Sequence, residues 1–267
     1  MAGNFVQLHN HTHYSLLDGA SKVPDLVKRV KELGMPAVGI TDHGNMHGAY
    51  ELWRAAVDSG VKPIIGIEAY VTPETARQDK TRVSWDTNWT PVPGHARNPD
   101  DVSGGGLITH LTMWAENDEG LVNLIKASSV ANLEGRVMRY PRMDKEVLST
   151  YSKGVIASSG CPSGIIQTRL RLGQFDEALR AAGEFQDIFG KDNFYIELMD
   201  HGLSIESKVT GDLLTIAKKL GAPLLATNDS HYVMEADKDA QDAMLCINSG
   251  ATLDDPNRFK FEGSGYY

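Results

Sequence analysis

The sequence is poor in cysteine, in basic charge and in long apolar runs, and each shortage excludes a class of protein. Only Cys161 and Cys246 are present, too few for a disulfide framework, so we expect a cytoplasmic protein. The 26 lysines and arginines are outnumbered by 35 aspartates and glutamates, and the net charge of −9 argues against bulk electrostatic binding to nucleic acid or anionic membrane. No apolar run approaches a membrane span, and the amino end lacks the pattern of a signal peptide.

Three common signatures of catalysis or cofactor binding are also missing. The sequence contains no Ser-His-Asp nucleophile elbow, no phosphate-binding glycine loop and no dinucleotide fingerprint. Its 41% hydrophobic content is ordinary for a globular protein, and 267 residues suffice for one α/β barrel. We therefore expect a single domain over residues 1–267. The aromatic carboxy end, Tyr266-Tyr267, indicates a cut through a longer chain.

Short apolar runs alternate with amphipathic stretches, which predicts an α/β fold with helices packed outside a parallel sheet. The predicted strands span residues 5–13, 37–40, 63–71, 107–114, 154–157, 193–198 and 223–227. The predicted helices span residues 23–33, 49–58, 121–133, 165–172, 175–189, 205–220 and 237–247. About seven strand–helix units is the count of a barrel rather than of a small open sheet.

The stretch from Thr72 to Gly106 breaks this alternation. It is rich in Pro, Asp, Asn and Arg and ends in Gly104-Gly105-Gly106. An insertion of this length in a compact domain is typically a functional or mobile loop. The small basic clusters elsewhere, such as Arg169 with Arg171, are expected to be solvated helix faces rather than a DNA track.

Residues that bind transition metals stand on or after most of the predicted strands. In parallel α/β folds, sites gather at the carboxyl ends of strands. His9 and His11 share one face of the first strand, roughly 6.5–7 Å apart between Cα atoms, and Asp229 and His231 have the same spacing. Glu68 lies in an otherwise apolar run, where a carboxylate is costly unless it is paired or coordinated. The nine candidate ligands are His9, His11, Asp18, His43, Glu68, His110, Cys161, Asp229 and His231.

Individually, several of these residues have simpler explanations. His110 alone fits a buried core histidine, and Cys161 alone fits a small buried hydrophobe. Asp42 fits a residue that orients His43 or caps the following helix. Together, however, nine ligands exceed the needs of one ion and fit two or three divalent ions. Mixed imidazole and carboxylate ligands suit zinc, manganese or iron, and the thiolate favours zinc. Clustered divalent ions with open positions suit hydrolysis of phosphate esters.

In order, these residues resemble the motifs of the PHP (polymerase and histidinol phosphatase) family. The opening motif is His9-Asn10-His11-Thr12-x-Tyr14-Ser15 with Leu17-Asp18-Gly19. Thr41-Asp42-His43-Gly44, Gly66-x-Glu68, the strand with His110, Gly160-Cys161-Pro162 and Asn228-Asp229-x-His231-Tyr232 follow. Asp255-Pro256-Asn257-Arg258-Phe259 and other details are similar to the amino-terminal PHP domains of bacterial replicative DNA polymerase III alpha subunits. His13 falls at a variable position of the motif and is not expected to be a ligand.

The resemblance implies a distorted (β/α)7 barrel with three metals at the carboxyl ends of the strands. It assigns His9, His11, Glu68 and Asp229 to one metal, Asp18, His43 and His231 to a second, and Glu68, His110 and Cys161 to a third, so all nine would be catalytic. A metal-bound hydroxide would attack the terminal phosphodiester, making the domain a proofreading 3′–5′ exonuclease. The implied partners are the primer 3′ end of DNA, the rest of the alpha subunit and replisome subunits such as the sliding clamp. The alternatives are a small-molecule phosphoesterase of the histidinol-phosphatase type and a non-catalytic, metal-stabilised scaffold.

Overall fold

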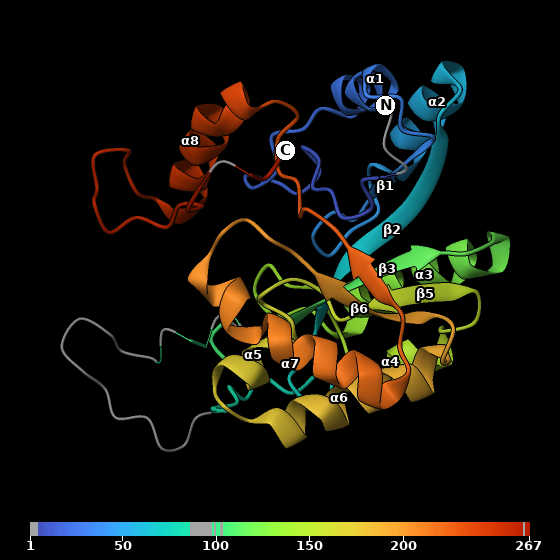
Figure 1. Ribbon diagram of the computed structural model, residues 1–267, viewed down its shortest axis with the longest axis vertical. Coiled ribbons are helices and arrows are strands. Elements are labelled where there is room, and N and C mark those ends of the chain that lie inside the picture. The colour runs from blue at the N-terminus through green and yellow to red at the C-terminus, as the bar shows by residue number, and fades with distance from the viewer. Residues whose placement is uncertain (1–4, 86–97, 99, 102–103, 264) are drawn as a thin grey trace. The chain divides into compact units, whose positions relative to one another are not determined.

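The chain divides into two compact units, each described by itself (Figure 1). The computed structural model describes residues 5–85, 98, 100–101, 104–263 and 265–267. The first unit comprises Met1–Ile67, Met199–Leu203 and Thr227–Tyr267, and the second comprises Glu68–Leu198 and Ser204–Ala226. The mixed α/β class predicted from the sequence is confirmed. Within the described ranges, no helix combines the length and the apolar character that crossing a membrane requires.

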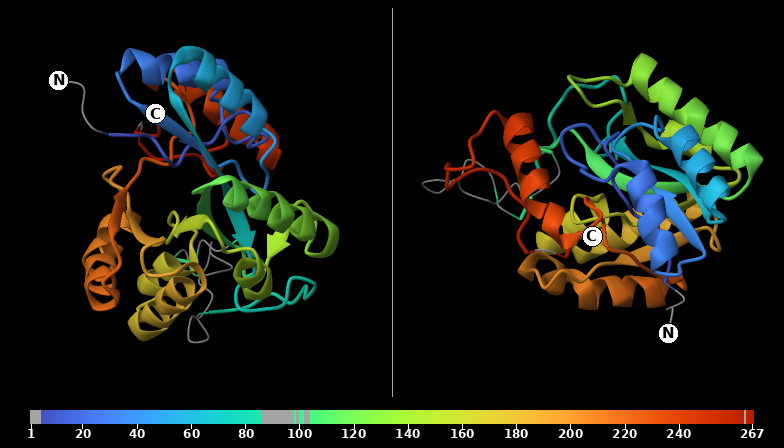
Figure 2. Two further views of the ribbon diagram at one scale, coloured as in Figure 1. Left: turned by 90° about the vertical axis from the view of Figure 1, so that its right-hand side faces the viewer. Right: turned by 90° about the horizontal axis from the view of Figure 1, so that it is seen from above.

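The first unit is built around a small apolar core between two helices and a strand. Its elements are α1 (Val23–Glu32), β1 (Ala37–Ile40), α2 (Ala49–Ser59), the first part of β2 (Lys62–Val71), η1 (Glu235–Asp237) and α8 (Lys238–Ser249). The apolar residues of α1 recur at helical spacing and pack with Leu52 and Ala56 of α2 and with Val38 and Ile40 of β1. Helices α1 and α2 lie side by side over the strands (Figure 2). β1 pairs in parallel with β2 from Ala37↔Lys62 to Ile40↔Ile65.

The amino-terminal segment runs beside β1 but is not a strand, which corrects the strand predicted for residues 5–13. Gly39 N–H donates to Gln7 O at 2.8 Å and Thr41 N–H to Asn10 O at 2.9 Å. On the other side only an isolated bridge forms, between Asn10 and Ser230. A Cβ on Gly39 would lie 2.6 Å from Leu8 O, so this close approach requires glycine. The polar side chains of the segment interrupt regular pairing, but its backbone is held from both sides.

The second unit contains the remaining strands, in the order β2, β3, β5, β6 and β7, with β4 beside β2. Their bounds are β3 (Thr109–Ala115), β4 (Arg142–Met143), β5 (Val155–Ser158), β6 (Phe194–Leu198) and β7 (Leu224–Ala226). β5, β6 and β7 are parallel, with pairs such as Ala157↔Phe194 and Ile196↔Leu224. β3 pairs antiparallel to β5, through Met113↔Ala157, which differs from the parallel sheet expected from the sequence. The strand β4 was not predicted, because two residues give no periodicity.

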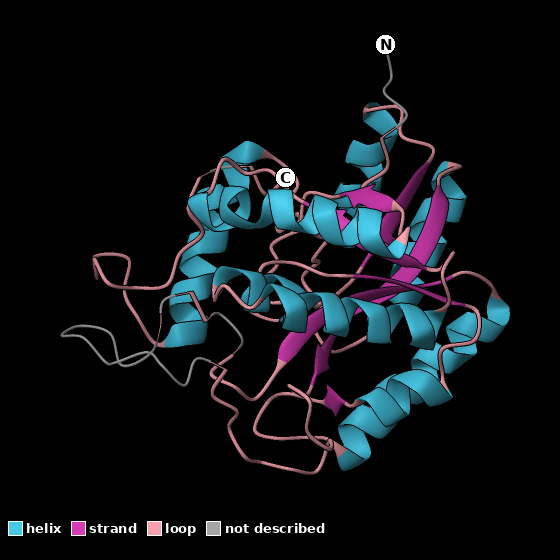
Figure 3. Cartoon of the chain, turned by 60° about the horizontal axis from the view of Figure 1, so that its bottom comes forward, coloured by secondary structure: helices cyan, strands magenta, loops and turns pink. Residues whose placement is uncertain are grey.

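Helices flank the strands of the second unit (Figure 3). They are α3 (Asp118–Glu134), α4 (Lys145–Thr150), α5 (Ile165–Arg171), α6 (Phe175–Phe189) and α7 (Ser204–Leu220). α3 contacts β3, β4 and β5, while α6 contacts β5 and β6 and α7 contacts β6. Asn117 caps the amino end of α3, and its side chain accepts from Gly120 N–H. The six-residue α4 is the one helix in this list that the sequence did not predict.

The first part of the predicted insertion, residues 72–85, is anchored to the second unit. Arg142, fully buried, donates to the carbonyls of Arg77 at 2.6 Å and Asp79 at 2.7 Å. Arg77 in turn contacts Asp144 at 3.1 Å. Trp85 is buried, and the Arg169 guanidinium lies 4.8 Å from its ring centroid. Most of the rest of the insertion, including residues 86–97, lies outside the described residues.

Candidate metal centre

Three segments of the first unit bring six of the predicted ligands together. The amino-terminal segment carries His9 and His11, and its backbone is bonded on one side to the chain that follows β1. On its other side, His11 N–H donates to Ser230 O at 2.8 Å and Ser230 N–H donates to His9 O at 3.1 Å. Asp18 and His43 follow shortly after these segments. Residues 220 positions apart along the chain are thereby placed beside one another.

His9, His11 and Asp229 form the first cluster. Asp229 Oδ1 lies 3.3 Å from His9 Nε2 and 3.1 Å from His11 Nε2. Both imidazoles are fully buried. Asp229 has a φ of 44°, a left-handed conformation that aspartate tolerates better than most residues. In this turn the carboxylate of Asp229 faces both histidines.

Asp18, His43 and His231 form the second cluster. Asp18 Oδ2 lies 2.7 Å from His43 Nε2 and 3.6 Å from His231 Nε2. The ring of His11 lies between the two clusters, with centroids 4.1 Å from His43 and 4.3 Å from His231. The imidazole nitrogens of these three histidines all lie within 4.8 Å of one another.

The carboxylates of this centre are held in their charged form. Burial raises the pKa of Asp18, but the neighbouring His231 and His43 outweigh burial and hold it well below its usual range. Burial likewise raises the pKa of Asp229, and His9, His231 and His11 together lower it below its ordinary value. Burial lowers the pKa of His231, whereas Asp229 and Asp18 raise it above its ordinary value. The centre therefore favours buried carboxylate charge balanced by positive charge.

The donor set fits transition-metal ions. Two atoms that bind one ion at about 2.0–2.2 Å lie about 2.8–3.6 Å apart for bond angles near those of tetrahedral or octahedral sites. The contacts of Asp229 with His9 and His11 fall in this range, as does that of Asp18 with His231. The 2.7 Å contact between Asp18 and His43 is instead a hydrogen bond, which an ion would replace. His231 Nδ1 donates to Asp229 O at 2.7 Å, which leaves Nε2 as its ligand atom.

The remaining three predicted ligands meet in the second unit. Glu68 is buried on β2, and its Oε1 lies 3.2 Å from Nδ1 of His110. Cys161 Sγ lies 3.5 Å from the same nitrogen. A carboxylate, an imidazole and a thiol in contact form a donor set suited to zinc.

His110 reaches this cluster from an unexpected direction. The sequence placed it at the carboxyl end of a parallel strand, whereas it is the second residue of β3. Because β3 runs antiparallel to β5, the start of β3 lies beside the end of β5, after which Cys161 follows. His110 N–H donates to Ser163 O at 3.2 Å, which fixes it against this loop. The start of β3 therefore lies at the same edge of the sheet as the carboxyl end of β5.

Three further contributing residues were missed from the sequence. Arg171, expected to be solvated, is buried and donates to Pro162 O at 2.7 Å; burial lowers its pKa to about 10. Its cation holds the loop that carries Cys161. In the first unit, Phe261 and Tyr266 pack edge-on against His231, at centroid distances of 4.6 and 6.2 Å. Neither role has a local sequence signal.

His13, excluded as a ligand, is 40% exposed at its side chain and lies 3.8 Å from Glu51.

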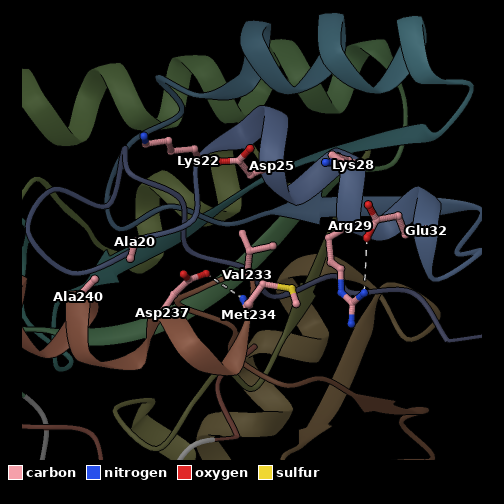
Figure 4. A pocket seen from close by; sticks show the side chains of 10 residues that line it. All are labelled: Ala20, Lys22, Asp25, Lys28, Arg29, Glu32, Val233, Met234, Asp237 and Ala240. Atoms are coloured by element: carbon pink, nitrogen blue, oxygen red, sulfur yellow. Dashed lines mark hydrogen bonds and ion pairs between the residues drawn. The ribbon is translucent and has the colours of Figure 1, made fainter.

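A separate pocket of about 510 Å³ lies beside α1 in the first unit (Figure 4). Its basic residues, Lys22, Lys28 and Arg29, are balanced by Asp25, Glu32 and Asp237. Arg29 is paired with Glu32 at 3.5 Å. The lining therefore has no excess positive charge with which to attract a phosphate.

The chain is similar to known proteins over most of its length. The family model described as "PHP domain" matches residues 7–201. The chain is 52% identical over 264 residues to DNA polymerase III subunit alpha of Mycobacterium leprae, covering 99% of this chain and 22% of that protein. It is 54% identical over 263 residues to the same subunit of Saccharopolyspora erythraea, covering 98% and 22%. The chain thus spans about a fifth of the length of these curated relatives. Asp229 and His231 lie outside the segment matched by the family model.

Solved structures show weaker similarity. An amidohydrolase from Chromobacterium violaceum with bound sulfate and no metal has a TM-score of 0.49 at 14% identity, covering 86% of this chain and 88% of that one. A two-domain protein from Bacteroides vulgatus, described as containing a predicted PHP-like metal-dependent phosphoesterase, has a TM-score of 0.45 at 13% identity, covering 92% and 55%. These similarities are too low to support a functional assignment.

Proposed function

This chain belongs to the PHP domain family, and on that premise we propose that it is the metal-dependent 3′–5′ exonuclease module of a DNA polymerase III alpha subunit. Its role would be proofreading: removal of the terminal nucleotide from a primer 3′ end during DNA replication in the cytoplasm. The observation that carries the proposal is the convergence of six side chains in one centre of the first unit: His9, His11, Asp229, Asp18, His43 and His231. The similarity to polymerase alpha subunits supplies the substrate class.

The six residues of the first unit would hold two divalent ions. His9, His11 and Asp229 would hold one, and Asp18, His43 and His231 the other, with zinc favoured and manganese or iron as alternatives. Bound ions supply water activation at neutral pH and neutralise charge on the phosphate and the departing 3′ oxygen.

The protein's own contribution is positioning and charge. Asp18 and Asp229 keep their carboxylates ionised in a buried setting, which provides the negative charge that cations need there. His231 is fixed by its Nδ1–H bond to Asp229 O, so Nε2 faces Asp18. Phe261 and Tyr266 shield one side of His231 from water. Water exclusion strengthens every charge interaction in the centre.

We propose that Glu68, His110 and Cys161 of the second unit hold a third ion. Their contacts at 3.2 and 3.5 Å are centred on His110. A thiolate ligand makes zinc the favoured metal at this position. The buried cation of Arg171 beside the Cys161 loop favours the ionised thiol, which is the form that binds metal.

The partners follow from the relatives. DNA, the remainder of an alpha subunit and replisome subunits such as the sliding clamp are proposed partners, because the aligned proteins are polymerase alpha subunits. The net charge of −9 indicates that this chain does not supply the main grip on DNA. The remainder of the subunit would therefore hold the primer.

The test is a single preparation assayed for metal and for nuclease activity. A primer labelled at its 3′ end should release labelled mononucleotide from the metal-loaded full subunit, whereas a primer blocked with a 3′ phosphate should be cut more slowly. Histidinol phosphate, offered in parallel, should not be hydrolysed. Hydrolysis of that compound alone would favour the small-molecule phosphoesterase. Bound metal that stabilises the protein without any hydrolysis would favour the scaffold.

A further inference from the structure

Ser15 occupies the centre of a hydrogen-bond network behind the first unit's metal cluster. It is buried, and its Oγ lies 2.7 Å from Asp42 Oδ1, 2.9 Å from His11 Nδ1 and 3.1 Å from the backbone nitrogen of His43. A serine hydroxyl has one hydrogen to donate and two lone pairs that accept. Three partners therefore use its full capacity, and the direction of each bond can be assigned.

Two of the three directions are fixed by chemistry. The backbone N–H of His43 can only donate, so it takes one lone pair of Ser15 Oγ. The Asp42 carboxylate can only accept, so it takes the one hydroxyl hydrogen. Asp42 is itself held in place by Thr12, whose N–H donates to Oδ1 at 2.7 Å and whose hydroxyl lies 2.9 Å from Oδ2. The carboxylate is buried and cannot turn away from Ser15 without losing these bonds.

The third direction follows by elimination. The remaining lone pair of Ser15 Oγ requires a donor, and the only partner left among these three is Nδ1 of His11. His11 must therefore carry its proton on Nδ1. In neutral His11 the lone pair is then on Nε2, the atom that lies 3.1 Å from Asp229 Oδ1. Two electron-rich atoms at this distance repel unless a cation lies between them.

We propose that Ser15 and Asp42 are positioning residues that set the tautomer of His11, so that its Nε2 is presented as a metal ligand, while Ser15 also fixes the backbone of His43. This inference deepens the proposed function, since it rests on the same centre, but it assigns roles to residues outside the nine ligands. One hydroxyl group thereby couples a ligand of the first cluster to a ligand of the second. Ser15 and Asp42 do not touch substrate and are not catalytic residues.

The direct test is nitrogen NMR of the metal-free chain labelled at histidine, because protonated and unprotonated ring nitrogens have distinct shifts. The His11 signals are identified by their loss in His11→Gln. In the wild-type chain, His11 should be protonated at Nδ1. A wild-type His11 protonated at Nε2 alone would overturn the proposal without any further variant. This measurement requires neither bound metal nor enzymatic activity. Its result is therefore independent of whether the proposed nuclease activity is found.

Variants then test whether the network causes the tautomer. Ser15→Ala removes the acceptor, so His11 should become a mixture of tautomers, and zinc affinity measured against a chelator should fall roughly 10–100-fold. Ser15→Thr keeps the hydroxyl and should restore both the tautomer and the affinity. Asp42→Asn keeps an acceptor oxygen toward Ser15 and should preserve the tautomer, whereas Asp42→Ala should not.

The matched control is Thr41→Val. Thr41 is equally buried and bonds only the backbone of Asn10 in this network, at 3.1 Å from its nitrogen. It should lower stability without changing the His11 tautomer. An unchanged tautomer in a folded Ser15→Ala chain, or an affinity loss no greater than in Thr41→Val, would overturn the proposal. If Ser15→Ala does not fold, Asp42→Ala and Asp42→Asn give the same comparison, and the wild-type spectrum decides on its own.

Discussion

Cys161 Sγ lies 3.5 Å from His110 Nδ1, which is also the nitrogen that faces Glu68. A thiolate and an imidazole of this kind are interchangeable zinc ligands, whereas a methyl group is not a ligand at all. The contact therefore predicts that the amount of bound metal depends on whether the residue at position 161 can act as a ligand.

Cys161→Ala should lower the bound metal by one ion per chain, and Cys161→His should retain it. Elemental analysis of protein dialysed against metal-free buffer measures both. Cys246→Ala, which changes the other buried cysteine, is the control and should bind as much metal as the wild type. Equal metal in Cys161→Ala and in the control would exclude the thiol as a ligand.

The chain should bind more than one transition-metal ion, because its two units present separate donor sets. Removing the metal with a chelator should lower Tm by about 5–10 °C, the effect expected when an ion present at roughly 100 times its Kd is lost from a chain of this size. Scanning calorimetry before chelation, after it and after zinc is restored measures this. One ion or fewer per chain under metal-replete conditions would contradict the multinuclear centre.

Asp18→Asn and Asp229→Asn should each abolish exonuclease activity in the full subunit while leaving the fold in place. An amide keeps the shape of the side chain but removes the charge that its histidine neighbours stabilise. Metal affinity should fall by roughly 10–100-fold or more. The comparison variant is Asp25→Asn, an exposed carboxylate on α1. Wild-type rates on a mismatched primer, with metal content unchanged, would show that the ligand assignment is wrong.

Arg142→Met should destabilise the second unit by about 3 kcal/mol or more, because four carbonyls lose their donor, among them those of the buried Gly135 and Leu107. One of them is the carbonyl of Arg77, which is part of the peptide bond that trypsin would cut. We expect this bond to resist trypsin in the wild type and to be cleaved readily in Arg142→Met. Arg139→Met, an exposed change nearby, should behave as the wild type. Equal cleavage after Arg77 in all three chains would show that Arg142 does not anchor this segment.

The chain alone should bind primer DNA weakly. With 26 basic against 35 acidic residues, it has few cations to displace counterions from phosphates. A salt titration of primer binding should give a shallower slope, and a much weaker affinity, for this chain than for the full subunit. Equal affinity and slope would place the grip on DNA within these 267 residues.

The sequence predicted most elements because apolar periodicity is a local property. Phe175–Phe189 was predicted with the observed bounds, and most other helices and strands were within a few residues. The strand predicted for residues 5–13 was wrong because the backbone of this segment bonds β1 and the loop at Ser230 at single positions only, without a continuous ladder. The antiparallel β3 could not be foreseen, since strand direction depends on partners that are distant in sequence.

The same distinction holds within the site. Asp229 and His231 were predicted to share a strand face from their spacing, but β7 ends at Ala226 and the left-handed backbone of Asp229 breaks the alternation, so the two side chains face different clusters. The role of Ser15 was not foreseen, although Ser15 lies in the opening motif. It depends on which of its hydrogen-bond partners donate and which accept, and only the three-dimensional contacts reveal those partners. Arg171 was expected on a solvated face, and its burial depends on the loop at Asp100 and Pro162.

The bridge between Asn10 and Ser230 has a consequence for the order of events during synthesis. A ribosome adds about 5–20 residues per second, so Ser230 emerges about 11–44 s after Asn10. Throughout that interval the second unit, whose sequence lies between these segments, can fold, while His9 and His11 lack their carboxylate. The first unit therefore completes last. The six candidate ligands of the first unit therefore come together only after residue 231 has left the ribosome.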